Sequence, residues 1–126
     1  MAVCQEFEID TENNVIPQIA SGFAGGIGNT GAVCGAVVGA VMALGLKQGR
    51  PDTMEEMLGN LAVAREFRRR FEAEMGTINC RELTGADFSA PEGIEQYMDS
   101  DIPQTVCFPA VSLAYLLVVD LLKETS

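Results

Sequence analysis

The sequence contains no histidine, and this absence excludes several classes of protein. Attachment of c-type haem, zinc or copper sites with imidazole ligands, and Ser-His or Cys-His catalytic pairs all require that side chain. Proton chemistry is therefore left to carboxylates, thiols, lysine or tyrosine. Basic residues are also few, with 8 Lys and Arg against 18 Asp and Glu. The net charge of -10 argues against nucleic acid or an anionic membrane surface as the main partner.

Close cysteine pairs are also absent, because the four cysteines are scattered along the chain and form no C-x-x-C motif. They are Cys4, Cys34, Cys80 and Cys107. Zinc ribbons and ferredoxin-type clusters normally use close pairs, so no local metal motif is present. The first residues lack the basic start of a signal peptide. We therefore expect a cytoplasmic protein whose thiols are free or only transiently paired.

The longest apolar run extends from Gly31 to Leu46 and is too short for a membrane span. A bilayer requires about 20 apolar residues in a helix. We therefore expect a buried core helix here and no membrane span. Gly31, Gly35 and Gly39 recur at four-residue spacing and would share one helix face, so we expect another backbone to approach this face closely.

No stretch alternates at period two, and apolar residues recur instead at helical spacing. The sequence predicts an all-α, single-domain bundle of five or six helices with a glycine-rich central helix. The second helix is expected to be capped by Asp10 and Thr11, and the glycine-rich helix by Asn29 or Thr30. The other expected helices are 1–9, 54–75 after a capping box at Thr53, a short helix after Asn79, 91–98 and 111–123.

Half of the basic residues lie on one side of the predicted helix 54–75. They are Arg65, Arg68, Arg69 and Arg70, and acidic residues stand among them. We interpret this cluster as a solvated face with salt bridges rather than as an anion site. The last helix is apolar nearly all round, which predicts burial against the rest of the chain or against a partner subunit.

A glycine-rich segment precedes the apolar run and contains the pattern G-x-G-x-x-G from Gly26 to Gly31. In a dinucleotide-binding fold this pattern follows a strand. The residues upstream are interrupted by Pro17, so a Rossmann fold is not favoured. A looser interpretation is that backbone amides of the segment bind an anion or cofactor. The candidate residues are Gly25, Gly26, Gly28, Gly31 and Gly35.

Three of the cysteines are predicted at or near helix N-termini. Cys34 follows the expected cap of the glycine-rich helix, Cys80 follows Asn79, and Cys107 lies just before Pro109. The positive end of a helix stabilises a thiolate, which makes these residues candidate redox groups. Cysteine is also a small residue that is often simply buried. The spacing alone leaves both interpretations open.

These residues resemble the C_GCAxxG_C_C family of small proteins regarded as redox-active. The core motif is Cys34-Gly35-Ala36-x-x-Gly39, followed by INCRELTGADFSAPEG and then Cys107. The resemblance covers essentially the whole chain. It implies an all-helical fold similar to that of split-Soret cytochromes, with cysteines that are redox-active or metal-binding and with no established substrate. By motif match, Cys34, Cys80 and Cys107 correspond to three of the family's four cysteines.

The family's first cysteine stands upstream of the position of Cys4. The resemblance therefore implies that residues 1–126 form one helical domain that lacks the family's N-terminal segment. Without a C-x-x-C-H motif, c-type haem is not expected.

The leading hypothesis is a cytoplasmic redox protein. Cys34 would form a reversible disulfide with Cys80 or Cys107, or these thiolates, together with the thiol of Cys4 or of an upstream cysteine, would bind zinc or an iron-sulfur cluster. The protein would exchange electrons with a partner. The alternative is a helical homodimer whose cysteines are structural. A third hypothesis is an anion- or nucleotide-binding protein that uses the glycine-rich loop.

Overall fold

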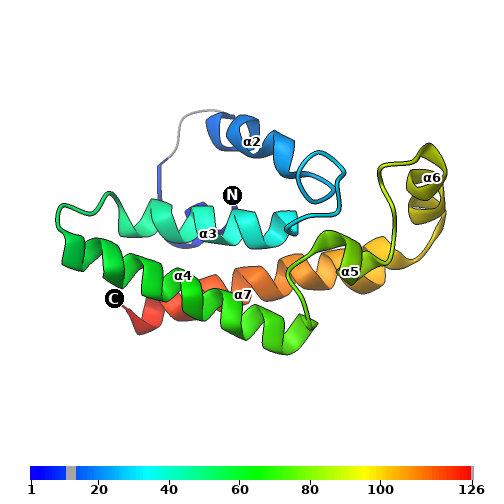
Figure 1. Ribbon diagram of the computed structural model, residues 1–126. Helices are drawn as coiled ribbons and strands as arrows, with labels where there is room; N and C mark the ends of the chain where they lie inside the picture. Colours follow the sequence, from blue (N-terminus) through cyan, green and yellow to red (C-terminus); the bar gives the residue numbers. More distant parts are fainter. Residues whose placement is uncertain (11–13, 126) are drawn as a thin grey trace.

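Three long helices lie side by side along the molecule, and the shorter elements gather around them (Figure 1). The computed structural model describes residues 1–10 and 14–125. Within these residues the α-helices are α1 (Ala2–Glu6), α2 (Val15–Ala20), α3 (Gly35–Gln48), α4 (Met54–Met75), α5 (Cys80–Thr84), α6 (Pro91–Asp99) and α7 (Phe108–Glu124). A 3-10 turn, η1 (Ser21–Phe23), follows α2, and a π-helical turn, η2 (Pro103–Cys107), leads directly into α7.

The prediction of an all-α single domain is confirmed. The described residues form seven α-helices, one in each of the ranges predicted above, although the bundle was expected to have five or six. Helices α1 and α5 are only 5 residues long each. The predicted cap at Thr11 lies outside the described residues. Helix α2 begins later than expected, after Asn14, whose backbone is left-handed with φ of 60°.

Helix α4 begins and ends where its sequence signals predict. The hydroxyl of Thr53 accepts a hydrogen bond from the backbone N–H of Glu56 at 3.1 Å. The Glu56 carboxylate in turn accepts one from the N–H of Asp52 at 2.8 Å. Gly76 ends the helix in a left-handed conformation with φ of 87°, which favours glycine. These local signals fix the length of the longest helix independently of its packing.

The core forms where α7 packs against α3 and α4. Phe67 and Phe71 of α4 are fully buried and stack with ring centroids 5.9 Å apart. Leu44 of α3 and Val118 of α7 are also fully buried in this cluster. Helix α1 adds Val3 to the same core. The three long helices therefore form a platform, and α5 and α6 lie at one end of it (Figure 1).

The exposed face of α4 is the predicted salt-bridged surface. Arg68 pairs with Glu72, and Arg69 pairs with Glu66 at 2.6 Å. Arg70 joins Glu66 at 2.9 Å and also reaches Glu124 at the end of α7 at 2.8 Å. The arginine side chains hold the pKa of Glu66 at about 2, well below its usual value, mainly through these hydrogen bonds. The interpretation of the arginine cluster as paired rather than anion-binding is confirmed for these three arginines.

Two expectations about the glycine-rich helix are wrong. It begins at Gly35, with Cys34 as the N-cap residue, so Asn29 and Thr30 belong to the preceding loop. Gly31 lies in that loop with φ of 74° and shares no helix face with Gly35 and Gly39. An added Cβ at Gly39 would meet nothing within 4 Å. A close backbone approach occurs instead at the loop glycine Gly26, where an added Cβ would lie 2.5 Å from the backbone N of Ala32. Its positive φ lets the chain turn back on itself.

The helical stretch from Pro103 to Glu124 is long and apolar enough to cross a membrane, judged by length and composition among the described residues. Its most apolar 18-residue window is 33% buried inside the protein. The core helix of a soluble protein meets the same criteria, and α7 does contact α1, α3 and α4. One such helix is weak evidence, so the absence of a membrane span stays a prediction.

We predict that Phe71→Ala lowers the free energy of unfolding by about 3–5 kcal/mol, since it opens a cavity beside Phe67 in the core. Urea unfolding followed by circular dichroism measures this change. Leu58→Ala is the control on the same helix, because Leu58 is 56% exposed, and we expect a change within about 0.5 kcal/mol. Equal losses in both variants would contradict the assignment of the core.

Candidate functional site

Cys34 and Cys80 are brought together by a short antiparallel pairing of two loop segments. Val33 and Asn79 form an isolated β-bridge. The N–H of Cys34 donates to the carbonyl of Ile78 at 2.7 Å, and the N–H of Cys80 donates to the carbonyl of Ala32 at 2.7 Å. Successive side chains in extended backbone point to opposite sides. Because each cysteine directly follows its bridged residue, the two thiols lie on the same side of the pairing.

Each of these cysteines also stands at the start of a helix. Cys34 is the N-cap residue of α3, and Cys80 is the first residue of α5 after its N-cap, Asn79. The prediction for Cys80 is confirmed. Cys34 lies at the helix start rather than inside its first turns, because the helix begins later than expected.

The glycine-rich loop packs directly against Cys80. Gly26 is buried, and a Cβ added to it would lie 2.8 Å from the Cβ of Cys80 and 2.5 Å from the backbone N of Ala32. Its φ of 73° is also left-handed. At Gly31, an added Cβ would lie 2.7 Å from the Cβ of Arg81. These two glycines let the loop lie against the residues that begin α5.

Cys107 reaches the same place from the opposite end of the chain. It is the last residue of η2, and η2 contacts α5. Cys107 directly precedes α7, as expected, but the helical backbone already begins at Ile102, so this helix start has no free backbone amides. Segments of π-helix occur often at functional sites. The extra residue in this turn changes which way the side chains before α7 point.

Tyr97 of α6 holds the Cys107 side chain. Its hydroxyl donates a hydrogen bond to the Cys107 sulfur at 3.1 Å. The ring packs edge-on against buried Phe88, with centroids 4.8 Å apart. Burial, the hydrogen bond to Cys107 and the nearby thiols raise the pKa of Tyr97 to about 12. The phenol therefore stays protonated at neutral pH and remains a donor to the sulfur.

The three thiols line one cavity of about 360 Å³. The glycine-rich loop contributes Gly25 and Gly26 to its wall, and α3 contributes Gly35. Most of the remaining wall is apolar, from Leu83, Phe88, Ile94, Met98, Val106 and Val111. Among the described residues that line the cavity, none has a charged side chain. Ligand pockets are commonly of this size and are mostly apolar with a few polar groups.

The thiols influence one another within this cavity. Burial is the main cause that raises the pKa of the Cys80 thiol, and the neighbouring thiols of Cys34 and then Cys107 raise it further. A hydrogen bond with Thr84 opposes these effects. A thiolate on a neighbour therefore makes Cys80 hold its proton more tightly. Both of the other cavity thiols thus affect the pKa of Cys80.

The other predicted site residues lie partly outside this cavity. Cys4 is buried in α1 and does not line it. Gly28 and Gly31 also do not line it, whereas Gly25, Gly26 and Gly35 do. The residues before the glycine-rich loop form α2 and η1 rather than a strand. The G-x-G-x-x-G pattern therefore stands outside the strand context of a dinucleotide site.

Sequence reasoning missed two parts of the site. The bridge between Val33 and Asn79 is a single residue pair, so it produces no alternating pattern along the chain. Tyr97 was assigned no role, although its position within the amphipathic helix α6 could have suggested a buried face. The bridge joins segments that are distant in the sequence, and the contact of Tyr97 with Cys107 depends on how α6 folds back against η2.

The three thiols suit soft metals such as zinc and iron in an iron-sulfur cluster by their chemistry. In residues 1–10 and 14–125, however, no group of three or more Cys, Asp or Glu side chains is placed to hold a metal ion. Four ligands are also usual in a structural zinc site. The arrangement of the described residues therefore does not fit a bound metal.

Residues 1–121 match the family model described as "Putative redox-active protein (C_GCAxxG_C_C)". No curated protein and no solved structure matches the chain. The match extends over the core motif at Cys34 and over all of the cavity described above. All four cysteines lie within the matched residues.

We predict that Gly26→Ala separates the glycine-rich loop from Cys80, because the added methyl would overlap the backbone of Ala32 and the Cys80 side chain. Gly28→Ala is a matched control, since Gly28 also has positive φ of 63° but open space around it. Both variants lose about 1–2 kcal/mol of stability from the left-handed backbone. Gly26→Ala should lose a further 1–3 kcal/mol or so by urea unfolding. Equal losses would contradict the close packing.

We also predict that Tyr97→Phe slows alkylation of Cys107 at neutral pH by about tenfold, because the variant removes the hydrogen bond that holds this sulfur in place at the cavity. Time-resolved iodoacetamide labelling with peptide mass spectrometry measures each cysteine separately. Labelling of Cys34 should stay unchanged. Tyr115→Phe is the control, since its hydroxyl contacts Glu6 and not a thiol. A uniform change at all cysteines would indicate a structural role only.

Proposed function

The chain belongs to the C_GCAxxG_C_C family, and we propose that it is a thiol redox protein in which Cys80 and Cys34 form a reversible disulfide. One observation supports this proposal most strongly. Three cysteines that are far apart in the sequence, Cys34, Cys80 and Cys107, line one cavity, while Cys4 is buried elsewhere. Burial of unrelated structural cysteines would not require three of them to converge.

Cys34 is the favoured partner of Cys80 for two reasons. The backbone pairing at Val33 and Asn79 puts both thiols on one side, at diagonal positions. Diagonal neighbours in such a pairing have Cα atoms about 7–8 Å apart, and disulfides usually span about 4–7 Å, so closure requires a shift of about 1 Å. In addition, Cys34 acts on the pKa of Cys80 more strongly than Cys107 does.

The proposed reaction is a two-electron exchange. In the reduced protein one thiolate attacks a sulfur of a partner disulfide, which releases one thiolate and leaves a mixed disulfide. A second cysteine of the cavity attacks the protein sulfur of that mixed disulfide and releases the other thiolate. The protein loses two protons and two electrons as its S–S bond forms, and the partner disulfide becomes two thiols.

Cys107 is the third thiol and would enter the exchange through Cys80. The hydrogen bond from Tyr97 holds the Cys107 sulfur in place at the cavity. All four cysteines are free thiols. We expect this reduced state to be the usual one in the cytoplasm, where small thiols keep cysteines reduced. We propose that location for the protein and a partner that exchanges electrons with it.

A second function is supported by the exposed apolar side chains of the long helices. Val41 of α3, Leu61 of α4 and Leu116 of α7 are 42%, 51% and 57% exposed. Such residues suit a homodimer in which the cysteines are structural. Sedimentation equilibrium of the reduced wild-type protein measures its mass, and the thiol experiment below decides whether the cysteines have a redox role.

We predict that oxidation of the reduced protein in a dithiothreitol redox buffer yields a disulfide between Cys34 and Cys80. Alkylation of the remaining thiols and peptide mass spectrometry identify it. Cys34→Ser and Cys80→Ser should remove this disulfide, and Cys4→Ser should retain it, because Cys4 does not line the cavity. We expect one reversible transition between the reduced protein and the disulfide form, in which each protein molecule exchanges two electrons.

Two results would overturn the proposal. Equal oxidation of wild type and Cys80→Ser would show that Cys80 is not required. The second result is stoichiometric zinc or iron in anaerobically purified protein that is released only when the three cavity thiols are modified. It would instead support the prediction that these thiolates bind a metal.

A further inference from the structure

We propose that the oxidant of this thiol site is a small, uncharged disulfide with apolar substituents, and that the cavity discriminates against anionic disulfides. The inference rests on the proposed thiol redox function. Its basis is the wall of the cavity in which Cys34, Cys80 and Cys107 meet. A substrate disulfide must place one sulfur beside these thiols, so its substituents must occupy the adjoining space.

The walls of that space are apolar. Leu83 follows Cys80 on α5, Ile94 and Met98 come from α6, and Val106 and Val111 flank Cys107. The polar groups are the thiols themselves, the Tyr97 hydroxyl, and the side chains of Thr84 and Asn29. The Tyr97 hydroxyl donates to Cys107, and the Thr84 hydroxyl donates to the carbonyl of Cys80. An apolar substituent would therefore gain from burial here.

An anionic substituent would find no compensating charge. None of the described residues that line the cavity is basic. Arg81, which follows Cys80, does not line the cavity, and its guanidinium lies 3.9 Å from the Asp87 carboxylate. The net charge of the chain is -10, so the long-range field also opposes an anion. Burial of an unpaired charge is costly, whereas an uncharged group avoids this cost.

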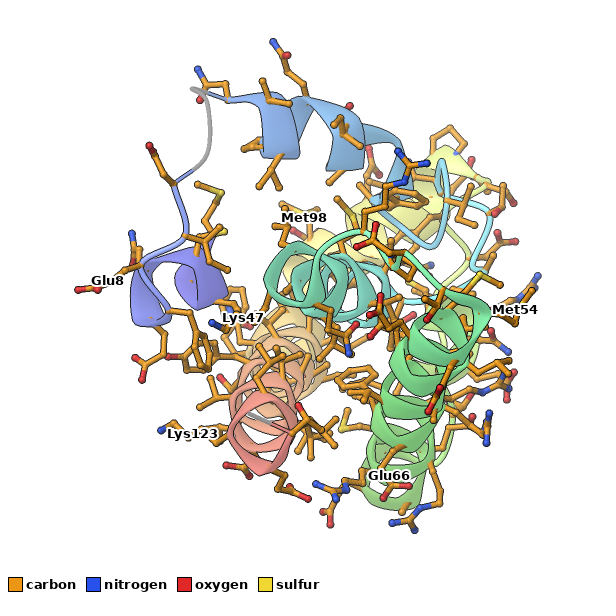
Figure 2. All side chains as sticks on the ribbon, turned by 90° about the vertical axis from the view of Figure 1, so that its left-hand side faces the viewer. Glu8, Lys47, Met54, Glu66, Met98 and Lys123 are labelled. Atoms are coloured by element: carbon orange, nitrogen blue, oxygen red, sulfur yellow. The ribbon has the colours of Figure 1, made fainter. Side chains whose placement is uncertain are left out.

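One exposed side chain of the cavity wall can test this inference directly. Met98 lines the cavity and is 69% exposed, so a longer polar side chain can be placed there without disturbing a core. Met54, at the start of α4, is 66% exposed and does not line the cavity. Figure 2 labels both residues, which come from different helices. Lysine at either position changes the net charge equally, but only Met98→Lys puts the charge at the thiol site.

The experiment compares two aromatic disulfides with the reduced protein at pH 7. One is 4,4′-dithiodipyridine, which is uncharged, and the other is 5,5′-dithiobis(2-nitrobenzoate), which is a dianion. Stopped-flow absorbance measures the rate at which each reagent releases its aromatic thiol. For the folded protein, the rate with the uncharged reagent is divided by the rate with the dianion. This ratio is then divided by the same ratio for the urea-unfolded protein, which corrects for the different intrinsic reactivities of the two reagents. We expect the folded protein to prefer the uncharged reagent by about tenfold.

The two lysine variants separate the cavity from the overall charge. Met98→Lys should speed the reaction with the dianion about threefold or more and leave the uncharged reagent nearly unchanged. Met54→Lys should leave both rates nearly unchanged. The preference of wild type should persist at 0.5 M or so of salt, where long-range repulsion is screened. Loss of the preference in salt, or equal effects of both lysines, would overturn the inference.

The same reaction distinguishes this inference from the proposed function. With the disulfide reagent limiting, release of two aromatic thiols per reagent molecule shows that a protein disulfide forms, and release of one shows that the mixed disulfide persists. A preference for the uncharged reagent with only one thiol released would refute the internal disulfide and retain the specificity of the cavity. Two thiols released without any preference would refute the specificity alone.

Discussion

The backbone pairing of residues 32–34 with residues 78–80 is the constraint on which the candidate site depends. Two hydrogen bonds of 2.7 Å flank the bridge between Val33 and Asn79, and they join the segment before α3 to the segment before α5. Each segment ends in a cysteine that begins or caps a helix. A pairing of backbone groups thus determines where two side chains lie, and it leaves their sulfur atoms free to react.

The long helices and the site have different physical bases. Phe67, Phe71, Leu44 and Val118 are fully buried between α3, α4 and α7, and this burial stabilises the platform. The thiols lie instead at element ends, where the loop, α5 and η2 meet near one end of the platform (Figure 1). Such an arrangement allows small shifts between thiols at little cost to the core, which a reversible disulfide requires.

The role of glycine in this protein differs from the one that its spacing suggests. Four-residue spacing predicted a smooth helix face, yet the space beside Gly39 is open. At Gly26, in contrast, a side chain has no room, because Ala32 and Cys80 occupy the space. Pattern reasoning recognised that the loop and the helix are rich in glycine. It could not identify which glycine touches a cysteine 54 positions later, since that contact follows from the path of the loop.

The sequence by itself determined the helical class, the limits of α4 and the identity of the family motif. Helical periodicity, the capping box at Thr53 and the spacing of Cys34, Gly35 and Gly39 are local properties, so one chain is enough to recognise them. Only the tertiary structure decided that Cys34, Cys80 and Cys107 share a cavity with Tyr97 and that Cys4 does not. That selection depends on how loops and helix ends pack, and such contacts between distant residues have no signature at fixed spacing.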